Sequence, residues 1–278
     1  MSVKQRTLKS EFSLNGKGLH TGKQVAATFK PAEENFGYRI RRMDLEGTPE
    51  IPALAEYVKL MDRASCLEKD GVCVFTMEHA MAALYGSGID NCLIELSGEE
   101  FPILDGSAKY YVEEIEKVGF EEQKADRRYF TVKEQMEFCS EDGQTKITLL
   151  PDTDYNINLV VAYDSPYLQM QYATYSEKVT DFAKEIAPCR TFVFLRELEM
   201  LLQHNLIKGG DLDNAIVIVD REISQEEVNR LAKLFNHDSI EVKQGILNNL
   251  DLYFDNEPAR HKLLDVIGDL SLCGRFIK

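Results

Sequence analysis

The sequence of 278 residues contains no tryptophan, five histidines and no long run of apolar residues. Runs such as Leu159-Val160-Val161-Ala162 are far shorter than the roughly 20 apolar residues that a helix needs to cross a bilayer. Residues 1–7 also lack the apolar segment of a secretory signal peptide. These absences predict a protein without a membrane span and with a cytoplasmic location.

Basic residues are also in short supply. The chain has 32 Lys and Arg against 47 Asp and Glu, which gives a net charge of −15. A nucleic-acid-binding surface needs clustered Lys and Arg to replace counterions, so we expect no nucleic-acid partner. A small anionic ligand is not excluded, because a few local cations can hold it. The six cysteines contain no C-x-x-C pair and are predicted to be reduced thiols.

The remaining composition is typical of a globular protein, with 44% apolar and 28% charged residues. Each half of the sequence mixes strand-like segments with a few helices, which is the α+β pattern. Ile89-Asp90-Asn91 and Leu212-Asp213-Asn214 each precede a predicted strand, so the two halves echo each other. We expect two layered α/β sandwich domains of related topology, residues 1–125 and 126–278. The polar, unpatterned residues 121–128 are the linker candidate.

Capping residues and helix-ending glycines predict helices in several segments of the chain. Thr76 is predicted to cap a helix that ends at Gly86. Ser224 and Glu227 form a capping box that opens another helix. Further helices are predicted from Leu195 to Leu206 and from about Pro258 to Gly274.

The last of these helices carries the first half of a predicted metal site. His261 and Asp265 are four residues apart, so on a helix they share one face and can close on one metal ion. Asp269 lies one further turn along, where it can hold a partner in place. One more imidazole would complete a three-ligand zinc site with an open position, which is the catalytic form. The alternative interpretation is a hydrogen bond on the helix surface.

Four other histidines can supply the missing imidazole. His79 stands out because Glu78 precedes it. A carboxylate next to a metal-bound imidazole would lie within reach of a metal-bound water and could remove its proton. His20 lies in a glycine-flanked loop and is a weaker candidate, and we interpret His204 and His237 as surface residues.

Several longer motifs follow one another along the chain: Gly18-Leu19-His20-Thr21-Gly22, Met77-Glu78-His79, Gly88-Ile89-Asp90-Asn91, Pro102-Ile103-Leu104-Asp105-Gly106-Ser107, Glu185-Ile186-Ala187-Pro188-Cys189-Arg190-Thr191-Phe192, Lys208-Gly209-Gly210-Asp211-Leu212-Asp213-Asn214 and Arg260-His261-Lys262-Leu263-Leu264-Asp265-Val266-Ile267-Gly268-Asp269-Leu270. In these motifs and their order, the sequence resembles the UDP-3-O-acyl-N-acetylglucosamine deacetylases, the zinc amidases of lipid A biosynthesis in Gram-negative bacteria. The resemblance extends over essentially the whole chain.

The resemblance implies a fold of two sandwich domains with the active site in the cleft between them. It implies Zn²⁺ held by His79, His261 and Asp265, with Glu78 as general base. The other implied roles are oxyanion binding by Thr191, substrate binding by Lys262 and Phe192, and orientation of a further catalytic histidine by Asp269. The insert around residues 192–214 would form an apolar passage for a fatty-acyl chain, although its leucines are equally consistent with core packing. Cys66 is predicted to border the substrate pocket, with an inert buried thiol as the alternative.

The implied reaction is hydrolysis of the N-acetyl group of UDP-3-O-acyl-N-acetylglucosamine to UDP-3-O-acyl-glucosamine and acetate, the committed step of lipid A biosynthesis. The family carries the further histidine in a Gly-His pair, which does not occur before Lys278. Loss of such an acid is expected to slow turnover by roughly 10²–10⁴-fold. Some members are fused to a downstream acyl-carrier-protein dehydratase. The alternative function is a sugar-nucleotide or acyl-chain binding module with a purely structural metal.

Overall fold

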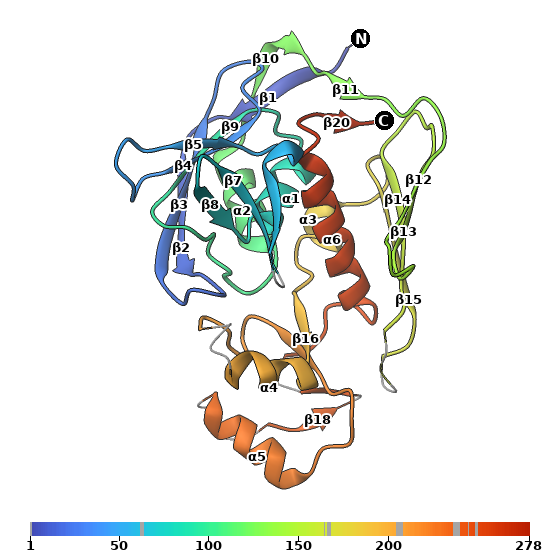
Figure 1. Ribbon diagram of the computed structural model, residues 1–278. Coiled ribbons are helices and arrows are strands. Elements are labelled where there is room, and N and C mark those ends of the chain that lie inside the picture. The colour runs from blue at the N-terminus through green and yellow to red at the C-terminus, as the bar shows by residue number, and fades with distance from the viewer. Residues whose placement is uncertain are drawn as a thin grey trace.

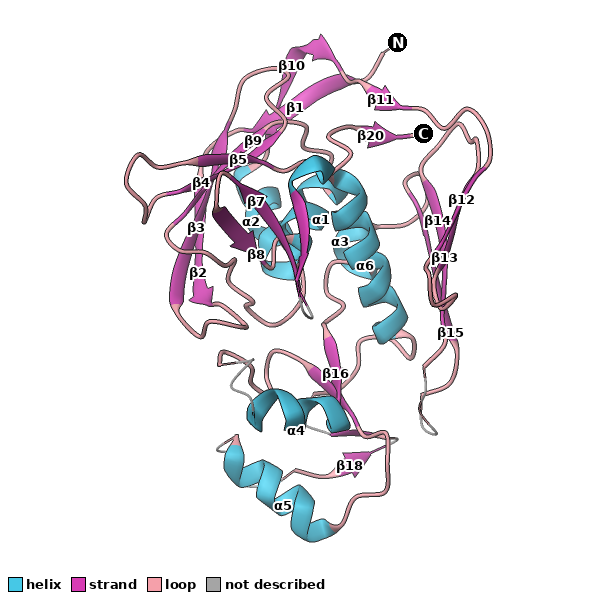
Figure 2. Cartoon of the chain, in the orientation of Figure 1, coloured by secondary structure: helices cyan, strands magenta, loops and turns pink. Residues whose placement is uncertain are grey.

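The computed structural model describes residues 2–61, 64–163, 165, 168–203, 208–235, 240–243, 245–247 and 250–278. Within these residues the fold is mixed α/β, with six α-helices (Figures 1 and 2). None of the described helices is long and apolar enough to cross a membrane. The cytoplasmic location stays a prediction, and His204 and His237 lie outside the described residues.

A five-stranded sheet forms one layer of the main body. Its order is β2 (Phe12–Lys17), β3 (Gln24–Pro31), β9 (Cys92–Leu96), β4 (Tyr38–Arg42) and β5 (Glu50–Pro52). Side chains alternate along β3, with Val25, Ala27 and Phe29 buried, as expected for a strand with one face on the core. Phe29 contacts Tyr111 of α2 (Lys109–Val118) edge to face, with ring centroids 5.8 Å apart.

A smaller sheet of β6 (Val58–Met61), β7 (Ala64–Lys69) and β8 (Val72–Phe75) leads into α1 (Glu78–Gly86). The predicted cap at Thr76 is wrong, because Met77 is the N-cap residue and no side chain caps this helix. Thr76 has a φ of 57°, a left-handed conformation that is rare for a β-branched residue. Its hydroxyl donates instead to the buried Glu100 Oε1 at 3.0 Å.

The predicted linker is also wrong. Most of it lies in β10 (Phe120–Asp126), which pairs antiparallel with β1 (Lys4–Leu8). The pairing uses backbone groups while most β10 side chains are exposed, so the sequence shows no apolar alternation. The main hydrophobic core takes residues from both predicted halves, from Leu8 to Phe276. The division at residue 125 and the two-sandwich arrangement stay predictions.

Helix α6 (Glu257–Ser271) runs through the middle of the molecule, between α1 and the ribbon of β14 (Asn156–Val161) and β15 (Gln171–Ser176) (Figure 1). The remaining elements of this region are α3 (Phe182–Glu185), the ribbon of β12 (Met136–Cys139) and β13 (Lys146–Leu149), and the parallel pair of β11 (Tyr129–Phe130) and β20 (Phe276–Ile277). The strands β12 to β15 lie on the side of α6 away from α1 (Figure 2), whereas Phe182 of α3 and Phe276 of β20 lie close to the C-terminal end of α1.

A second, smaller core lies below α6 in Figure 1. It is built by β16 (Phe192–Phe194), β17 (Ile216–Ile218), β19 (Ile246–Leu247), β18 (Val242–Lys243), α4 (Leu195–Gln203) and α5 (Gln225–Leu234). The capping box is confirmed at its first bond, since Ser224 Oγ accepts from the Glu227 N–H at 3.2 Å. Leu198 is buried in this core, as the core interpretation of the insert predicts.

Helices α1 and α6 approach each other closely at Gly268. A Cβ atom added at Gly268 would lie 2.2 Å from the backbone oxygen of Glu78, a distance that real Cβ atoms do not adopt. A residue without a side chain is therefore required at this position of α6.

We expect Gly268→Ala to destabilise the fold although Ala is the better helix former by about 1 kcal/mol. Overpacking should dominate and lower the free energy of unfolding by about 1–3 kcal/mol, measured by urea denaturation. Gly98→Ala is the control, because its Cβ would meet Val25 Cγ2 at an ordinary 3.5 Å. An unchanged midpoint for Gly268→Ala would show that the two helices are not in close contact.

Candidate metal centre

Three of the predicted site residues converge where α1 meets α6. His79 is the second residue of α1, and His261 and Asp265 lie one turn apart on α6. Asp265 Oδ1 is 3.8 Å from His79 Nε2 and 3.4 Å from His261 Nε2. One nitrogen or oxygen atom of each residue lies within 4.8 Å of the others. Two ligands on a tetrahedral zinc ion are about 3.3 Å apart, so this spacing suits one metal ion.

The surroundings of these atoms fit a cation. Asp265 Oδ1 is buried and has no hydrogen-bond partner, while Asp265 Oδ2 accepts from Lys262 Nζ at 2.9 Å. An unsatisfied buried carboxylate oxygen is costly unless something positive binds it. His261 Nδ1 is 3.0 Å from the carbonyl oxygen of Cys189, the partner that leaves Nε2 with a lone pair for a metal.

The protonation states also suit metal binding. Burial lowers the pKa of His261 to about 4, and burial lowers the pKa of His79 as well. Both rings are therefore neutral at pH 7, the form that coordinates metals. Burial opposes ionisation of Asp265, but its interactions with His261 and with the Lys262 ammonium outweigh burial and lower the pKa of this carboxyl group.

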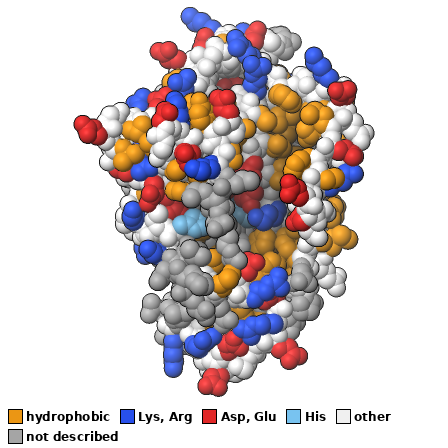
Figure 3. Space-filling model, viewed as in Figure 1, with side chains coloured by type: hydrophobic (Ala, Val, Ile, Leu, Met, Phe, Trp, Pro, Cys, Tyr) orange, Lys and Arg blue, Asp and Glu red, His pale blue; other side chains and the backbone are white. Residues whose placement is uncertain are grey.

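Two further carboxyl groups lie beside this group of ligands. Desolvation and the charge of Asp265 raise the pKa of Glu78 to about 7. Desolvation, together with the charges of Asp265 and Glu78, also raises the pKa of Asp269 to about 7. A carboxyl group with a pKa near the working pH can both accept and release a proton. Figure 3 shows a histidine side chain near the middle of this face of the molecule, whereas the ligands His79 and His261 are themselves buried.

The predicted substrate-binding residues lie at varying distances from this centre. Phe192 faces His261 with ring centroids 6.5 Å apart, and Lys262 Nζ lies 5.4 Å from the centre of the Phe192 ring. Thr191 immediately precedes β16 and donates its backbone N–H to Gly106 O at 2.8 Å. Cys66 is buried on β7, opposite Phe75 of β8, the strand that leads toward Glu78. Its substrate role stays a prediction.

His20 reaches the same region through a loop. Its backbone N–H donates to Glu100 Oε1 at 2.8 Å, and its charge is among the influences that lower the pKa of Glu78. The loop also packs against Gly209, since a Cβ at Gly209 would lie 2.0 Å from Gly18 O and the Gly209 N–H donates to Leu19 O at 3.0 Å. His20 is therefore a neighbour of Glu78 and lies outside the three-ligand group.

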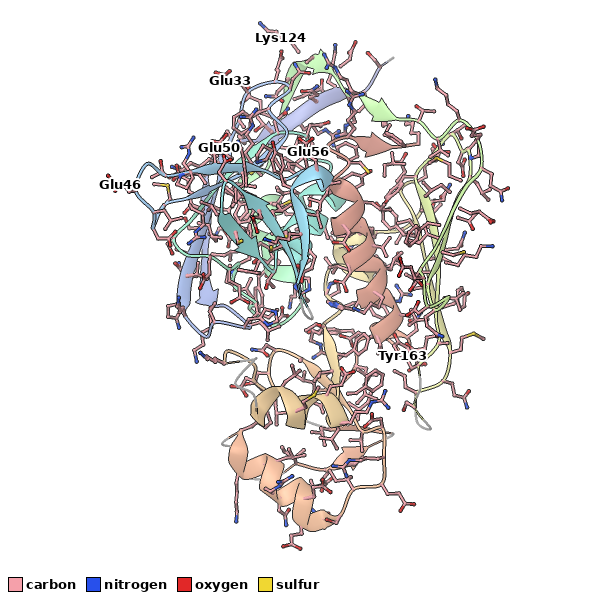
Figure 4. The ribbon with its side chains drawn as sticks, in the orientation of Figure 1. Glu33, Glu46, Glu50, Glu56, Lys124 and Tyr163 are labelled. Atoms are coloured by element: carbon pink, nitrogen blue, oxygen red, sulfur yellow. The ribbon has the colours of Figure 1, made fainter. Side chains whose placement is uncertain are left out.

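Sequence reasoning missed Tyr163. Its ring contacts Phe192 and Phe194 at centroid distances of 5.5 and 6.0 Å, and its buried hydroxyl has no hydrogen-bond partner. Burial and the charge of Asp265 raise the pKa of Tyr163, and Figure 4 shows Tyr163 beside the lower end of α6. A tyrosine after a strand carries no local signal of this role. The Cys189 carbonyl was missed for the same reason, because any residue supplies a backbone oxygen.

Two imidazoles, one carboxylate and an adjacent titratable carboxyl group are typical of metal-dependent hydrolases. The family model described as LpxC, UDP-3-O-acyl N-acetylglycosamine deacetylase, matches residues 5–237 and 231–278. The chain belongs to this family, so the resemblance inferred from its motifs is confirmed.

Relatives of two kinds share this family. The bifunctional enzyme LpxC/FabZ of Bacteroides thetaiotaomicron is 53% identical over 277 residues, which cover 99% of this chain and 60% of the relative. Its counterpart in Porphyromonas gingivalis is 50% identical over 276 residues, with coverage of 99% and 60%. The UDP-3-O-acyl-N-acetylglucosamine deacetylase of Marinobacter nauticus is 39% identical over 277 residues, which cover 99% of this chain and 83% of the relative. The chain thus spans about 60% of the length of the bifunctional relatives.

We expect the purified protein to bind about one metal ion per chain, and Asp265→Ala or His79→Ala to lose it, because each variant removes one of three ligands. Metal analysis after dialysis measures this. His20→Ala is the control and should retain the ion. Wild-type protein without metal, or equal loss from the control, would contradict the assignment.

Proposed function

We propose that this chain hydrolyses the N-acetyl group of UDP-3-O-acyl-N-acetylglucosamine with the help of Zn²⁺, releasing acetate and UDP-3-O-acyl-glucosamine in the committed step of lipid A biosynthesis. The observation that carries the proposal is the group of His79, His261 and Asp265, with an unpartnered carboxylate oxygen, beside Glu78. Family membership supports the choice of substrate.

Zinc in this site would polarise the amide carbonyl and lower the pKa of a bound water to roughly 7. Glu78 removes a proton from the attacking water, for which a carboxyl group with a pKa of about 7 is well matched. The Thr191 hydroxyl donates to the oxyanion that forms on the amide, and one such donor is typically worth about 3–4 kcal/mol. Lys262 binds the substrate near the reacting carbonyl, held by its contact with Asp265.

Aromatic side chains would line the path of the rest of the substrate. Phe192, Tyr163 and Phe194 form one cluster of ring contacts next to His261. We propose that this cluster packs against the sugar and the start of the acyl chain. The insert at residues 192–214 would continue as the apolar passage, with part of its leucines packed as core.

The leaving amine needs a proton donor. Asp269 lies one turn beyond Asp265 on the same helix, and desolvation together with nearby negative charge raises its pKa. We propose that it orients the histidine of the family's Gly-His pair. We further propose that this chain is the deacetylase part of a bifunctional enzyme with an acyl-carrier-protein dehydratase, as the names of the relatives at 53% and 50% identity suggest.

A binding module with a structural metal remains the alternative function. A structural zinc site is closed by a fourth protein ligand, often cysteine. Among the described residues the group has three members, and neither Cys66 nor Cys189 belongs to it. An open fourth position next to a carboxyl group favours the hydrolase.

Glu78→Gln should reduce kcat for deacetylation by roughly 10²–10⁴-fold because it removes the proton acceptor. The variant should keep its metal, since Glu78 is not one of the three ligands. Release of acetate and metal content are the two measurements. Glu113→Gln on the exposed side of α2 is the control. Full activity of the Glu78 variant would sink the assignment of the base.

Shortening the substrate's acyl chain tests the apolar passage. Each buried methylene contributes about 0.8 kcal/mol, so removing several should lower kcat/KM by more than about tenfold. Steady-state kinetics on substrates of matched headgroup and different chain length measure the effect. A kcat/KM that does not depend on chain length would remove the passage from the proposal.

A further inference from the structure

A buried ion pair lies beside the candidate centre and has no part in the reaction proposed above. Arg190 is 6% exposed and Glu257 is fully buried at 0%. Arg190 directly precedes Thr191, and Glu257 is the first residue of α6, one turn before His261. The pair therefore joins two segments that carry predicted site residues.

The contacts of the pair are numerous and specific. Glu257 Oε1 accepts from the Arg190 backbone N–H at 3.0 Å and from Arg190 Nε at 2.9 Å. Glu257 Oε2 accepts from Arg190 Nη2 at 3.1 Å and from the Tyr253 backbone N–H at 2.7 Å. Arg190 Nη2 also donates to the carbonyl of Asp251 at 2.6 Å, and the guanidinium carbon lies 4.5 Å from the Tyr253 ring centre.

Both neighbours of Arg190 in the chain are held by hydrogen bonds that their carbonyl groups accept. The Cys189 carbonyl lies 3.0 Å from His261 Nδ1 and so sets the orientation of that ring. Thr191 is anchored on its other side, because its carbonyl accepts from the Ile216 N–H at 2.8 Å. The ion pair also holds the beginning of α6, because Glu257 is the first residue of that helix. It therefore connects the segment that carries Cys189 to the helix that carries His261.

Stability alone does not account for a pair of this kind. Desolvating two charges costs several kcal/mol per ion, and uncharged replacements of similar volume are often as stable. The pair instead fixes the relative orientation of the two segments, because a planar guanidinium and a carboxylate can bind each other in few orientations. Arg127 and Asp90 form a comparable buried pair, 10% and 9% exposed, at 2.7 Å. That second pair lies beyond the far end of α1 from Glu78 and serves as an internal comparison.

We propose that Arg190 and Glu257 are positioning residues that aim the Cys189 carbonyl at His261 and the Thr191 side chain at the reacting carbonyl. The part concerning Thr191 rests on the proposed deacetylase function. The part concerning His261 rests on the metal site alone.

The test compares Arg190→Met, Glu257→Gln and the double variant in full-length protein. Each single variant leaves a buried charge or its hydrogen-bonding groups without a partner and should lower Tm. The double variant removes both charges and keeps an acceptor for the backbone N–H groups, so most of the Tm should return. The measurements are Tm, metal affinity by competition with a chromogenic chelator, and kcat and KM for deacetylation.

Positioning predicts that activity does not return with Tm in the double variant. Metal affinity and kcat should each stay about 10–100-fold below wild type, as is usual when the outer partner of a metal-bound histidine is changed, while KM changes by less than about threefold. Recovery of metal affinity and kcat together with Tm would overturn the proposal, because the pair would then be structural.

Two further variants keep the test decisive. Arg127→Met with Asp90→Asn should shift Tm in the same way and leave kcat and metal affinity within about twofold of wild type; an equal loss would also overturn the proposal. If the double variant does not fold, Arg190→Lys retains a cation but loses the two-point geometry, and unchanged metal affinity in that variant would contradict positioning. Should wild-type protein bind metal but not release acetate, the proposed function fails and metal affinity still decides the role of the pair.

Discussion

The contact of α1 with α6 at Gly268 is the constraint on which the candidate centre depends. Glu78 and His79 lie in the first turn of one helix, and His261 and Asp265 lie on the other. Their ligand atoms come within 4.8 Å because the helices touch without an intervening side chain. A wider spacing would leave a pair of ligands on one helix and a lone histidine on the other.

The contact between α1 and α6 also brings the carboxyl groups of Glu78, Asp265 and Asp269 together in a largely buried site. Asp265 stays ionised because its interactions with His261 and Lys262 lower its pKa, and desolvation together with the Asp265 charge raises the pKa of both Glu78 and Asp269 to about 7. The buried Asp265 Oδ1, which has no hydrogen-bond partner, further destabilises the folded protein when no cation is bound. A cation bound at this site would offset the negative charge and provide a partner for the Asp265 oxygen. It would therefore stabilise the folded protein by mass action. Metal binding and folding are thus expected to be linked.

Local patterns in the sequence predicted much of this architecture. A mixture of strand-like segments and helices was expected and is observed, and helical spacing placed His261 and Asp265 on one face, as α6 now shows. Predictions failed where a distant partner outweighed the local signal. Glu100 takes the hydroxyl that was expected to cap α1 at Thr76, and β1 pairs with the segment expected to be a linker. Tyr163 was missed because its partners lie about 30 residues or more away.

The sequence by itself determined which chemical groups are available and which of them share a helix face, because side-chain type and helical period are local properties. Tertiary structure decided that His79 meets His261, that the Cys189 carbonyl orients the second imidazole, and that Glu78 and Asp269 titrate near neutrality. These features depend on burial and on charges from segments far apart in the chain, and no local window of sequence contains them.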